Sequence, residues 1–192
     1  MSPTSAKTPR MPMIPADKLT EDQRKVVAAV TAGPRGAVFG PFVPLLRSPE
    51  FMDRLQRTGE YLRYNSAFEP RLSELAILVT ARHWSQNFEW HAHRPIAEKA
   101  GLRLSIIEAV AEGRRPAAMA MDEAVIWDFL DELIRTKTVT QTTYDRAKAM
   151  FGERGIIDLV GIHGYYSLLA MVLNVTSAPL PEGAKPGLNP LP

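Results

Sequence analysis

The chain contains no cysteine among its 192 residues. Disulfide bonds, thiolate nucleophiles and cysteine-ligated metal sites are therefore excluded. Redox catalysis that alternates between a reactive thiolate and a resolving thiol is excluded with them, because neither group is present. Any chemistry of this protein must come from carboxylates, imidazoles, hydroxyls and cationic side chains.

An excess of charge of one sign is also missing. The 23 Lys and Arg residues against 21 Asp and Glu residues give a formal net charge of only +2. Such a small surplus does not indicate a nucleic-acid partner. No apolar segment typical of a secretion signal follows Lys7 and Arg10, and no membrane-length stretch lacks a charged or polar break. We expect a soluble, cytoplasmic protein with no membrane partner.

Convincing strand-like alternation is scarce, whereas signals for helix starts and ends are dense. Thr20 with Gln23 has the spacing of a capping box, and Pro49 fits the first turn of a helix. Ser85 is expected to cap one helix and Ser105 another. The expected helices cover residues 20–33, 49–64, from 71, 85–101, 105–113, 122–137, 140–152 and 155–174. The predicted fold class is all-α, with one helical domain at residues 16–178.

Prolines are concentrated at both ends of the chain. Residues 1–15 contain four prolines and residues 179–192 contain five, so neither segment can form a continuous helix. We expect an extended N-terminal arm at 1–15 and a Pro-rich C-terminal arm at 179–192. The apolar side chains that these arms could bury are Ile14, Leu180, Leu188 and Leu191. The arms either wrap a neighbouring subunit or form frayed termini, and the sequence leaves both open.

Residues 74–93 place two carboxylates and a histidine in an otherwise apolar region. These residues are Glu74, Glu89 and His93. Burying a carboxylate costs several kcal/mol unless a partner or hydrogen bond compensates. We therefore expect this segment to have either a structural pairing or a function.

The spacing within this segment limits the chemistry. In a helix, Gln86, Glu89 and His93 occupy positions i, i+3 and i+7 and share one face. His91 is two residues from His93, a step of about 200° around a helix, so the two imidazoles cannot chelate one metal ion from a regular helix. No metal site is expected. The alternative that we leave open is a Glu–His hydrogen bond that only satisfies two buried groups.

The order of these residues resembles the carboxymuconolactone decarboxylase and AhpD-like alkylhydroperoxidase superfamily. Its peroxidase branch has a Glu, a Cys twelve residues later, a second Cys after a further three, and a His four residues beyond. Glu74 and His93 match the first and last positions, whereas Gln86 and Glu89 replace the cysteines. Further segments that resemble the longer, decarboxylase-like members are 33–36, 40–42, 60–64, 95–98, 100–102, 158–160 and 164–166. Thiol peroxidase activity is not expected.

The resemblance implies an AhpD-like helical bundle that forms a homo-oligomer and needs no cofactor. It also implies a lyase or isomerase that acts on a small carboxylated unsaturated lactone or a related acid. His93 would be the general acid or base, because an imidazole can change charge near neutral pH. Glu89 or Glu74 would orient it, and their spacing favours Glu89 with His93 as one proton-transfer unit.

A substrate of this kind also needs a cation for its carboxylate and donors for a developing enolate oxygen. Arg35 is the leading cation, because its loop is flanked by Gly and Pro, although an exposed turn arginine is the plainer interpretation. The further candidates for substrate binding are Gln86, Arg82, His163 and Tyr166. His163 could equally mark tight helix packing, since Gly161 and Gly164 flank it. A non-catalytic, ligand-binding helical oligomer is the alternative function.

Overall fold

The computed structural model describes residues 8–189 and is all-α over this range, as predicted. Its elements are the 3-10 turn η1 (Ala16–Lys18) and the helices α1 (Glu21–Ala32), α2 (Phe42–Leu45), α3 (Pro49–Tyr64), α4 (Pro70–His83), α5 (Asn87–Lys99), α6 (Leu104–Ala111), α7 (Met121–Thr136) and α8 (Gln141–Thr176). The parts of the predicted arms at 1–7 and 190–192, including Leu191, lie outside the described residues.

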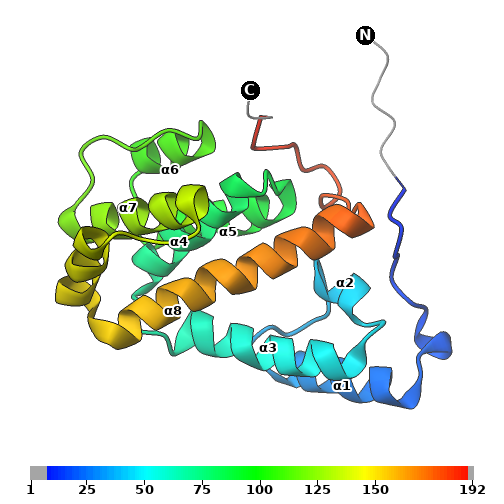
Figure 1. Ribbon diagram of the computed structural model, residues 1–192. Coiled ribbons are helices and arrows are strands. Elements are labelled where there is room, and N and C mark those ends of the chain that lie inside the picture. The colour runs from blue at the N-terminus through cyan, green and yellow to red at the C-terminus, as the bar shows by residue number, and fades with distance from the viewer. Residues whose placement is uncertain (1–7, 190–192) are drawn as a thin grey trace, which may run out of the picture.

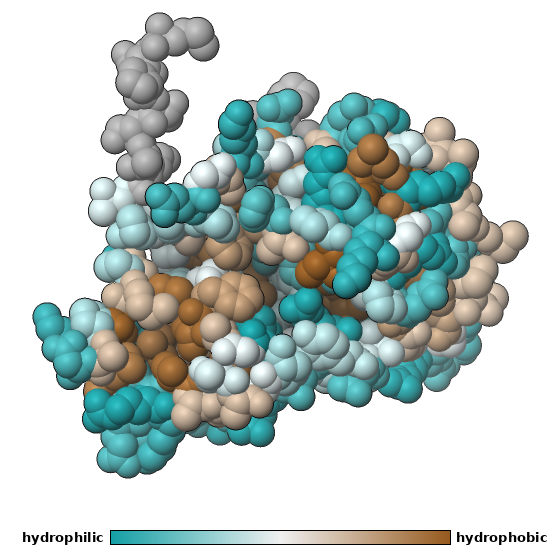
Figure 2. Space-filling model, turned by 180° about the vertical axis from the view of Figure 1, so that it is seen from behind, coloured by the Kyte–Doolittle hydropathy of each residue, from teal (hydrophilic) through white to brown (hydrophobic). Residues whose placement is uncertain are grey.

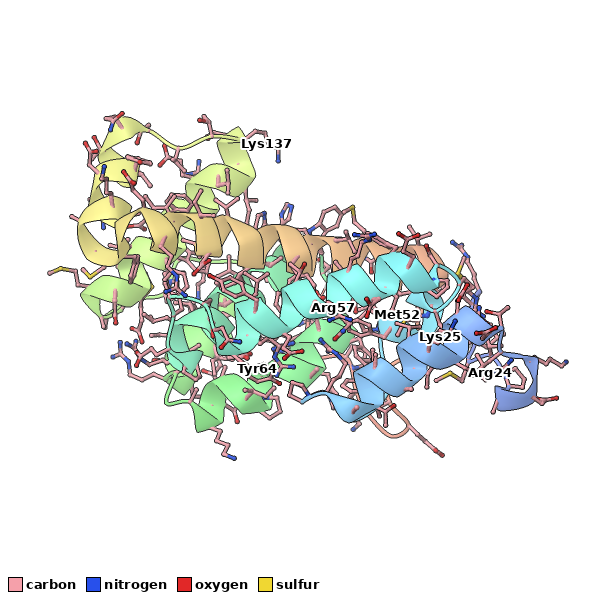
Figure 3. All side chains as sticks on the ribbon, turned by 90° about the horizontal axis from the view of Figure 1, so that it is seen from below. Arg24, Lys25, Met52, Arg57, Tyr64 and Lys137 are labelled. Atoms are coloured by element: carbon pink, nitrogen blue, oxygen red, sulfur yellow. The ribbon has the colours of Figure 1, made fainter. Side chains whose placement is uncertain are left out.

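Helix α4 is the centre of the bundle. It contacts α5, α6, α7 and α8, and every residue from 72 to 82 is buried. Helix α8 crosses the front of the view in Figure 1 and packs on α4, α7 and α3. Helix α1 lies along α3, with Lys25 and Arg57 near their shared surface (Figure 3). This arrangement explains why α4 has apolar residues on all sides, since neighbours cover its whole circumference.

Local capping confirms several predicted helix starts. The Thr20 hydroxyl accepts from Gln23 N, and the Gln23 side chain accepts from Thr20 N, which completes the predicted capping box. The predictions for Ser85 and Ser105 are wrong. Ser85 has a positive φ of 48°, and the Gln86 side chain accepts from Phe88 N to cap α5 instead. Helix α6 begins at Leu104, so Ser105 already lies inside it.

The two helices predicted at 140–152 and 155–174 form one kinked element, α8. The break is at Gly152, whose φ of 67° and ψ of 179° are not helical. By length and composition alone α8 contains a stretch that could cross a membrane, and half of that stretch is buried inside the bundle. Its apolar character is therefore used at least in part for the core.

The described parts of both arms pack on their own chain. In the N-terminal arm, Arg10 N donates to the carbonyl of Thr176 at 2.8 Å. In the C-terminal arm, Leu188 N donates to Asn87 Oδ1 at 2.9 Å, and the Leu188 side chain is buried. Wrapping of a neighbouring subunit stays a prediction.

Candidate functional site

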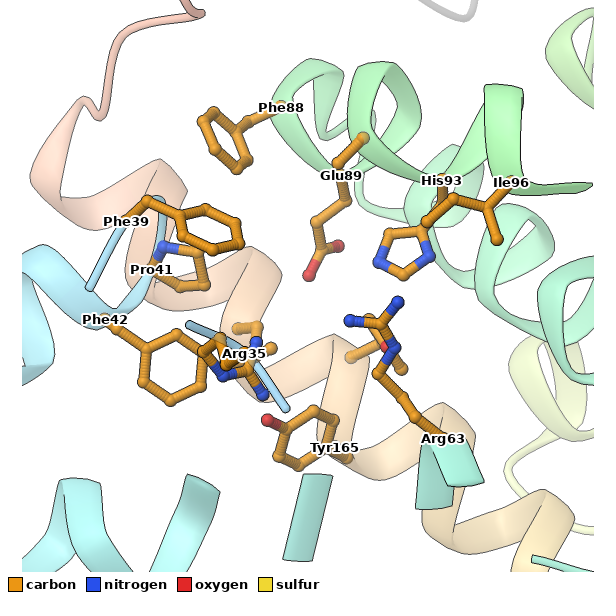
Figure 4. A pocket seen from close by; sticks show the side chains of 13 residues that line it. Arg35, Phe39, Pro41, Phe42, Arg63, Phe88, Glu89, His93, Ile96 and Tyr165 are labelled. Atoms are coloured by element: carbon orange, nitrogen blue, oxygen red, sulfur yellow. The ribbon is translucent and has the colours of Figure 1, made fainter. Parts of the chain in front are cut away.

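A cavity of about 210 Å³ lies between α5, α8, the end of α3 and the loop before α2. Figure 4 shows its side chains. The polar lining residues are Arg35, Arg63, Glu89, His93, Tyr165 and Tyr166. The apolar lining residues are Phe39, Pro41, Phe42, Phe88, Ala92, Ile96 and Leu169. A mainly apolar hollow with a few convergent polar groups is typical of a small-molecule site.

His93 is held by Glu74 across two helices. The His93 Nδ1 atom lies 2.7 Å from Glu74 Oε2, and both side chains are buried. In its ionised form Glu74 can only accept, which places a proton on Nδ1, so Nε2 is the acceptor nitrogen in the neutral imidazole. The pair therefore orients an imidazole at the wall of the cavity.

This contact corrects the prediction that Glu89 and His93 form one unit. Both residues line the cavity from α5, but Glu74 on α4 is the hydrogen-bond partner of His93. The cause is tertiary, because α4 packs directly against α5 and brings Glu74 to the imidazole. Spacing along α5 cannot report this contact.

Glu89 is buried without a partner. Glu89 is only 3% exposed, and neither of its carboxyl oxygens has a hydrogen-bond partner among the described residues. Burial raises the pKa of Glu89 well above its usual value, because the charged form loses its hydration. Burial therefore favours the protonated form of Glu89, whose side chain points into the cavity (Figure 4).

Two half-buried arginines line the same cavity. The Arg35 guanidinium carbon lies 4.0 Å from the centre of the Phe42 ring, and Arg35 Nε has no partner among the described residues. Arg63 enters from the end of α3, below His93 in Figure 4. Sequence reasoning missed Arg63, although it lies inside the family-like segment 60–64. Together these cations suit a carboxylate, which can accept paired N–H bonds.

Two tyrosines complete the polar lining. The Tyr166 ring stands edge-on to the His93 ring with centroids 5.0 Å apart. The Tyr165 hydroxyl has no hydrogen-bond partner among the described residues, and burial raises the pKa of Tyr165. Gly59 makes room for it, because a Cβ at that position would lie 2.0 Å from Tyr165 Oη. Tyr165 therefore offers a hydroxyl donor to the cavity that Glu89 also lines.

Three of the residues predicted to bind substrate do not line this cavity. Arg82 donates to the carbonyl of Ala111 at 3.1 Å and holds the last turn of α6. The Gln86 amide donates to Asn174 Oδ1 at 2.8 Å, and His163 Nδ1 lies 3.0 Å from the Thr80 hydroxyl. These side chains connect helices. By contrast, the predicted Arg35 and Tyr166 do line the cavity.

Within residues 8–189, no group of three or more His, Asp or Glu side chains is arranged to hold a metal ion. Arg94 is partly exposed and pairs with Glu98 at 2.8 Å one turn along α5. The groups available at the cavity are therefore a buried carboxyl group, an oriented imidazole, phenol hydroxyls and two guanidinium groups.

Comparison with known proteins places the fold. The model of the carboxymuconolactone decarboxylase family matches residues 49–132. A search of the curated proteins gives no match. The fold is similar to the crystal structure of an alkylhydroperoxidase AhpD core, an uncharacterized peroxidase-related protein from Ralstonia eutropha JMP134. The TM-score is 0.73 at 16% identity, over 95% of this chain and 97% of that chain. The chain therefore has the AhpD-like fold, and its residues 49–132 are similar to the carboxymuconolactone decarboxylase family.

Proposed function

We propose that the protein is a cofactor-free lyase or isomerase for a small carboxylated unsaturated lactone or a related acid. One observation carries this proposal: Glu89 is a buried, unpartnered acid in a cavity that two arginines also line. A neutral acid can stand beside an anionic substrate without repulsion. The bound anion would raise the pKa of Glu89 further and keep its proton in place.

The reaction needs few groups. Arg35 and Arg63 bind the substrate carboxylates. In a decarboxylation, the bond between the departing carboxylate and the ring carbon breaks, and its electron pair passes into the conjugated carbonyl as carbon dioxide leaves. The Tyr165 hydroxyl donates to the developing enolate oxygen. Glu89 then protonates the dienolate on carbon and recovers its proton from water.

The Glu74–His93 pair supplies a base on the same wall. With its proton held on Nδ1 by Glu74, His93 presents Nε2 to accept a proton from substrate carbon. Abstraction by His93 and delivery by Glu89 would move a double bond, which is an isomerisation. In the decarboxylation, the same imidazole would instead accept a hydrogen bond from the substrate or from water.

Turnover of unsaturated carboxylated lactones tests the proposal, with carbon dioxide release and loss of the conjugated chromophore as readouts. Glu89→Gln keeps the size but cannot deliver the proton, so kcat should fall by about 10²- to 10⁴-fold. Arg63→Gln should act mainly on KM. Arg94→Gln is the matched control, because Arg94 is partly exposed, pairs with Glu98 and does not line the cavity, and its rate should equal that of the unchanged protein. Equal rates for Glu89→Gln and Arg94→Gln would contradict the role of Glu89.

The alternative is a non-catalytic ligand-binding protein. The unpartnered polar atoms of Arg35, Glu89 and Tyr165 favour it equally, because a bound anion could satisfy them without reacting. The two functions differ in outcome. Tight binding of unsaturated acids that are recovered unchanged, with full loss of binding in Arg63→Gln, would support the binding protein over the enzyme.

We also propose that the chain works as a homo-oligomer through α8. Four exposed apolar residues lie along one side of this helix and form an apolar stripe of two pairs: Ile157 with Val160, and, eleven positions further on, Met171 with Val175. They cover 19 positions, or about 27 Å of helix at 1.5 Å per residue. An exposed apolar stripe of this length on a helix is typical of a contact between proteins.

A further inference from the structure

A second hollow adjoins the candidate site. Its volume is about 480 Å³, and it lies between the two arms and the loop that leads into α2. Met11 and Met13 line it from the N-terminal arm, Val38 and Val43 from the loop and α2, and Leu180 from the C-terminal arm. No charged side chain is among its lining residues in the described part of the chain. Figure 2 shows apolar side chains gathered at the left, where the N-terminal arm and the α1–α2 region lie.

Two phenylalanines form the wall between this apolar groove and the cavity. Phe39 and Phe88 line both hollows. The Phe88 ring packs closely against the backbone of Gly40. A Cβ added at Gly40 would lie only 2.5 Å from Phe88 Cε1. Phe39 is 46% exposed, and exposed side chains change rotamer within nanoseconds. Phe39 is therefore the movable half of the wall.

We infer that the substrate is amphipathic: its carboxylate lies between Arg35 and Arg63, and an apolar chain passes between Phe39 and Phe88 into the groove. This inference rests on the proposed carboxylate seat and adds the class of molecule bound there. The two hollows differ in the way that such a ligand requires, since one has two arginines and a buried carboxyl group and the other has only apolar walls. Their shared wall makes them one continuous site when Phe39 turns.

Binding of straight-chain saturated carboxylates, measured by calorimetry, tests this inference without any turnover. From butanoate to decanoate, each added methylene that enters the groove should tighten binding by roughly two- to fourfold, since full burial of a methylene gives about fourfold. Arg63→Gln should weaken every member of the series by a similar factor, because the head group is the same. Unchanged decanoate affinity in Arg63→Gln would mean that the groove binds alone, which overturns the spanning mode.

A charged substitution in the groove gives the second test. Met13→Asp, in the N-terminal arm, should flatten the chain-length dependence and leave butanoate binding unchanged. Met121→Asp is the matched control, because Met121 is 75% exposed and lines neither hollow. Its series should match that of the unchanged protein. Equal effects of the two substitutions would contradict the inference.

The outcomes separate this inference from the proposed reaction. Turnover of short lactones together with chain-length-independent binding would overturn the apolar chain and leave the reaction intact. Chain-length-dependent binding without any turnover would support the apolar chain and overturn the proposed reaction. If a second copy of the chain fills the groove instead, affinity will not depend on chain length and Met13→Asp will lower the sedimentation coefficient, which also overturns the inference.

Discussion

Glu89 is a residue whose burial lowers stability. Its folded-state pKa is raised, whereas in the unfolded chain it ionises near the ordinary value of 4.5. The folded state therefore holds more protons above pH 4.5, and the free energy of unfolding falls as the pH rises until Glu89 ionises in the folded state. Natural sites often keep a destabilising group because the function needs it.

The first prediction follows from this linkage. Glu89→Gln should remove the decline in stability above pH 4.5, which has a slope of at most about 1.4 kcal/mol per pH unit for one group. Urea denaturation from pH 5 to 8 measures it. The gap between Glu89→Gln and the unchanged protein should widen with pH, and a constant gap would contradict the raised pKa.

The second prediction concerns Gly59, whose missing side chain leaves room for the Tyr165 hydroxyl. In Gly59→Ala the new methyl lies 2.0 Å from Tyr165 Oη, so the rigid ring must move toward the cavity or α3 must shift. Overpacking of this kind typically costs about 1–3 kcal/mol, and carboxylate binding should weaken with it. Gly33→Ala is the control, since its Cβ would make only ordinary contacts at 3.6 Å. Equal stability of the two variants in thermal unfolding would count against this packing.

The sequence was sufficient to predict which residues surround the site, but not which of them touch. Glu74, Glu89 and His93 were expected together because carboxylates are rare in apolar segments. Their pairing depends on how α4 crosses α5, a tertiary feature that spacing along one helix does not encode. Arg63 was missed for a similar reason, because an arginine at the end of an amphipathic helix is usually a solvated surface residue.

At the scale of helices, the positions of Pro, Gly and capping residues in the sequence predicted most helix boundaries correctly. The misses have local causes. Ser85 adopts a left-handed backbone conformation, which a cap residue does not have, and the four-residue α2 is too short to show any periodicity. The break that the sequence indicated between two helices near Gly152 is present, as the kink inside α8.

The third prediction belongs to the contact between α4 and α8. Burial, with smaller contributions from His83 and Lys137, lowers the pKa of His163 from 6.5 to about 4. The unfolded chain therefore binds more protons between these values, and stability should fall as the pH drops from 6.5 to 4, with no further loss from this group below 4. Because His163 is partly exposed, we expect a loss of about 2 kcal/mol.

Replacement of this histidine should remove the effect. His163→Gln keeps a donor for the Thr80 hydroxyl and cannot be protonated, so its stability should lose that part of the pH dependence. His91→Gln, at an exposed position of α5, serves as the control and should keep it. Chemical denaturation at pH 4, 5, 6 and 7 measures both, and parallel curves for the two variants would rule out His163 as the source.

For the whole molecule, the fourth prediction is assembly through the apolar stripe of α8. Ile157 is 70% exposed and Val175 is 64% exposed, so neither contributes much to the core of one chain. Ile157→Glu with Val175→Glu should convert an oligomer into monomers in sedimentation velocity at micromolar concentration, because association would bury the new charges. Met121→Glu should leave assembly unchanged. A monomeric unchanged protein would refute this prediction.

Whether Glu89 keeps its proton at neutral pH is the most direct test of the proposed chemistry. Infrared difference spectra between the unchanged protein and Glu89→Gln isolate the signal of this one carboxyl group. At pH 7 we expect the carbonyl stretch of a protonated carboxylic acid, which persists when a saturated carboxylate fills the cavity. A difference spectrum that contains only carboxylate bands at pH 7 would show that Glu89 is ionised, and would contradict its role as the proton donor.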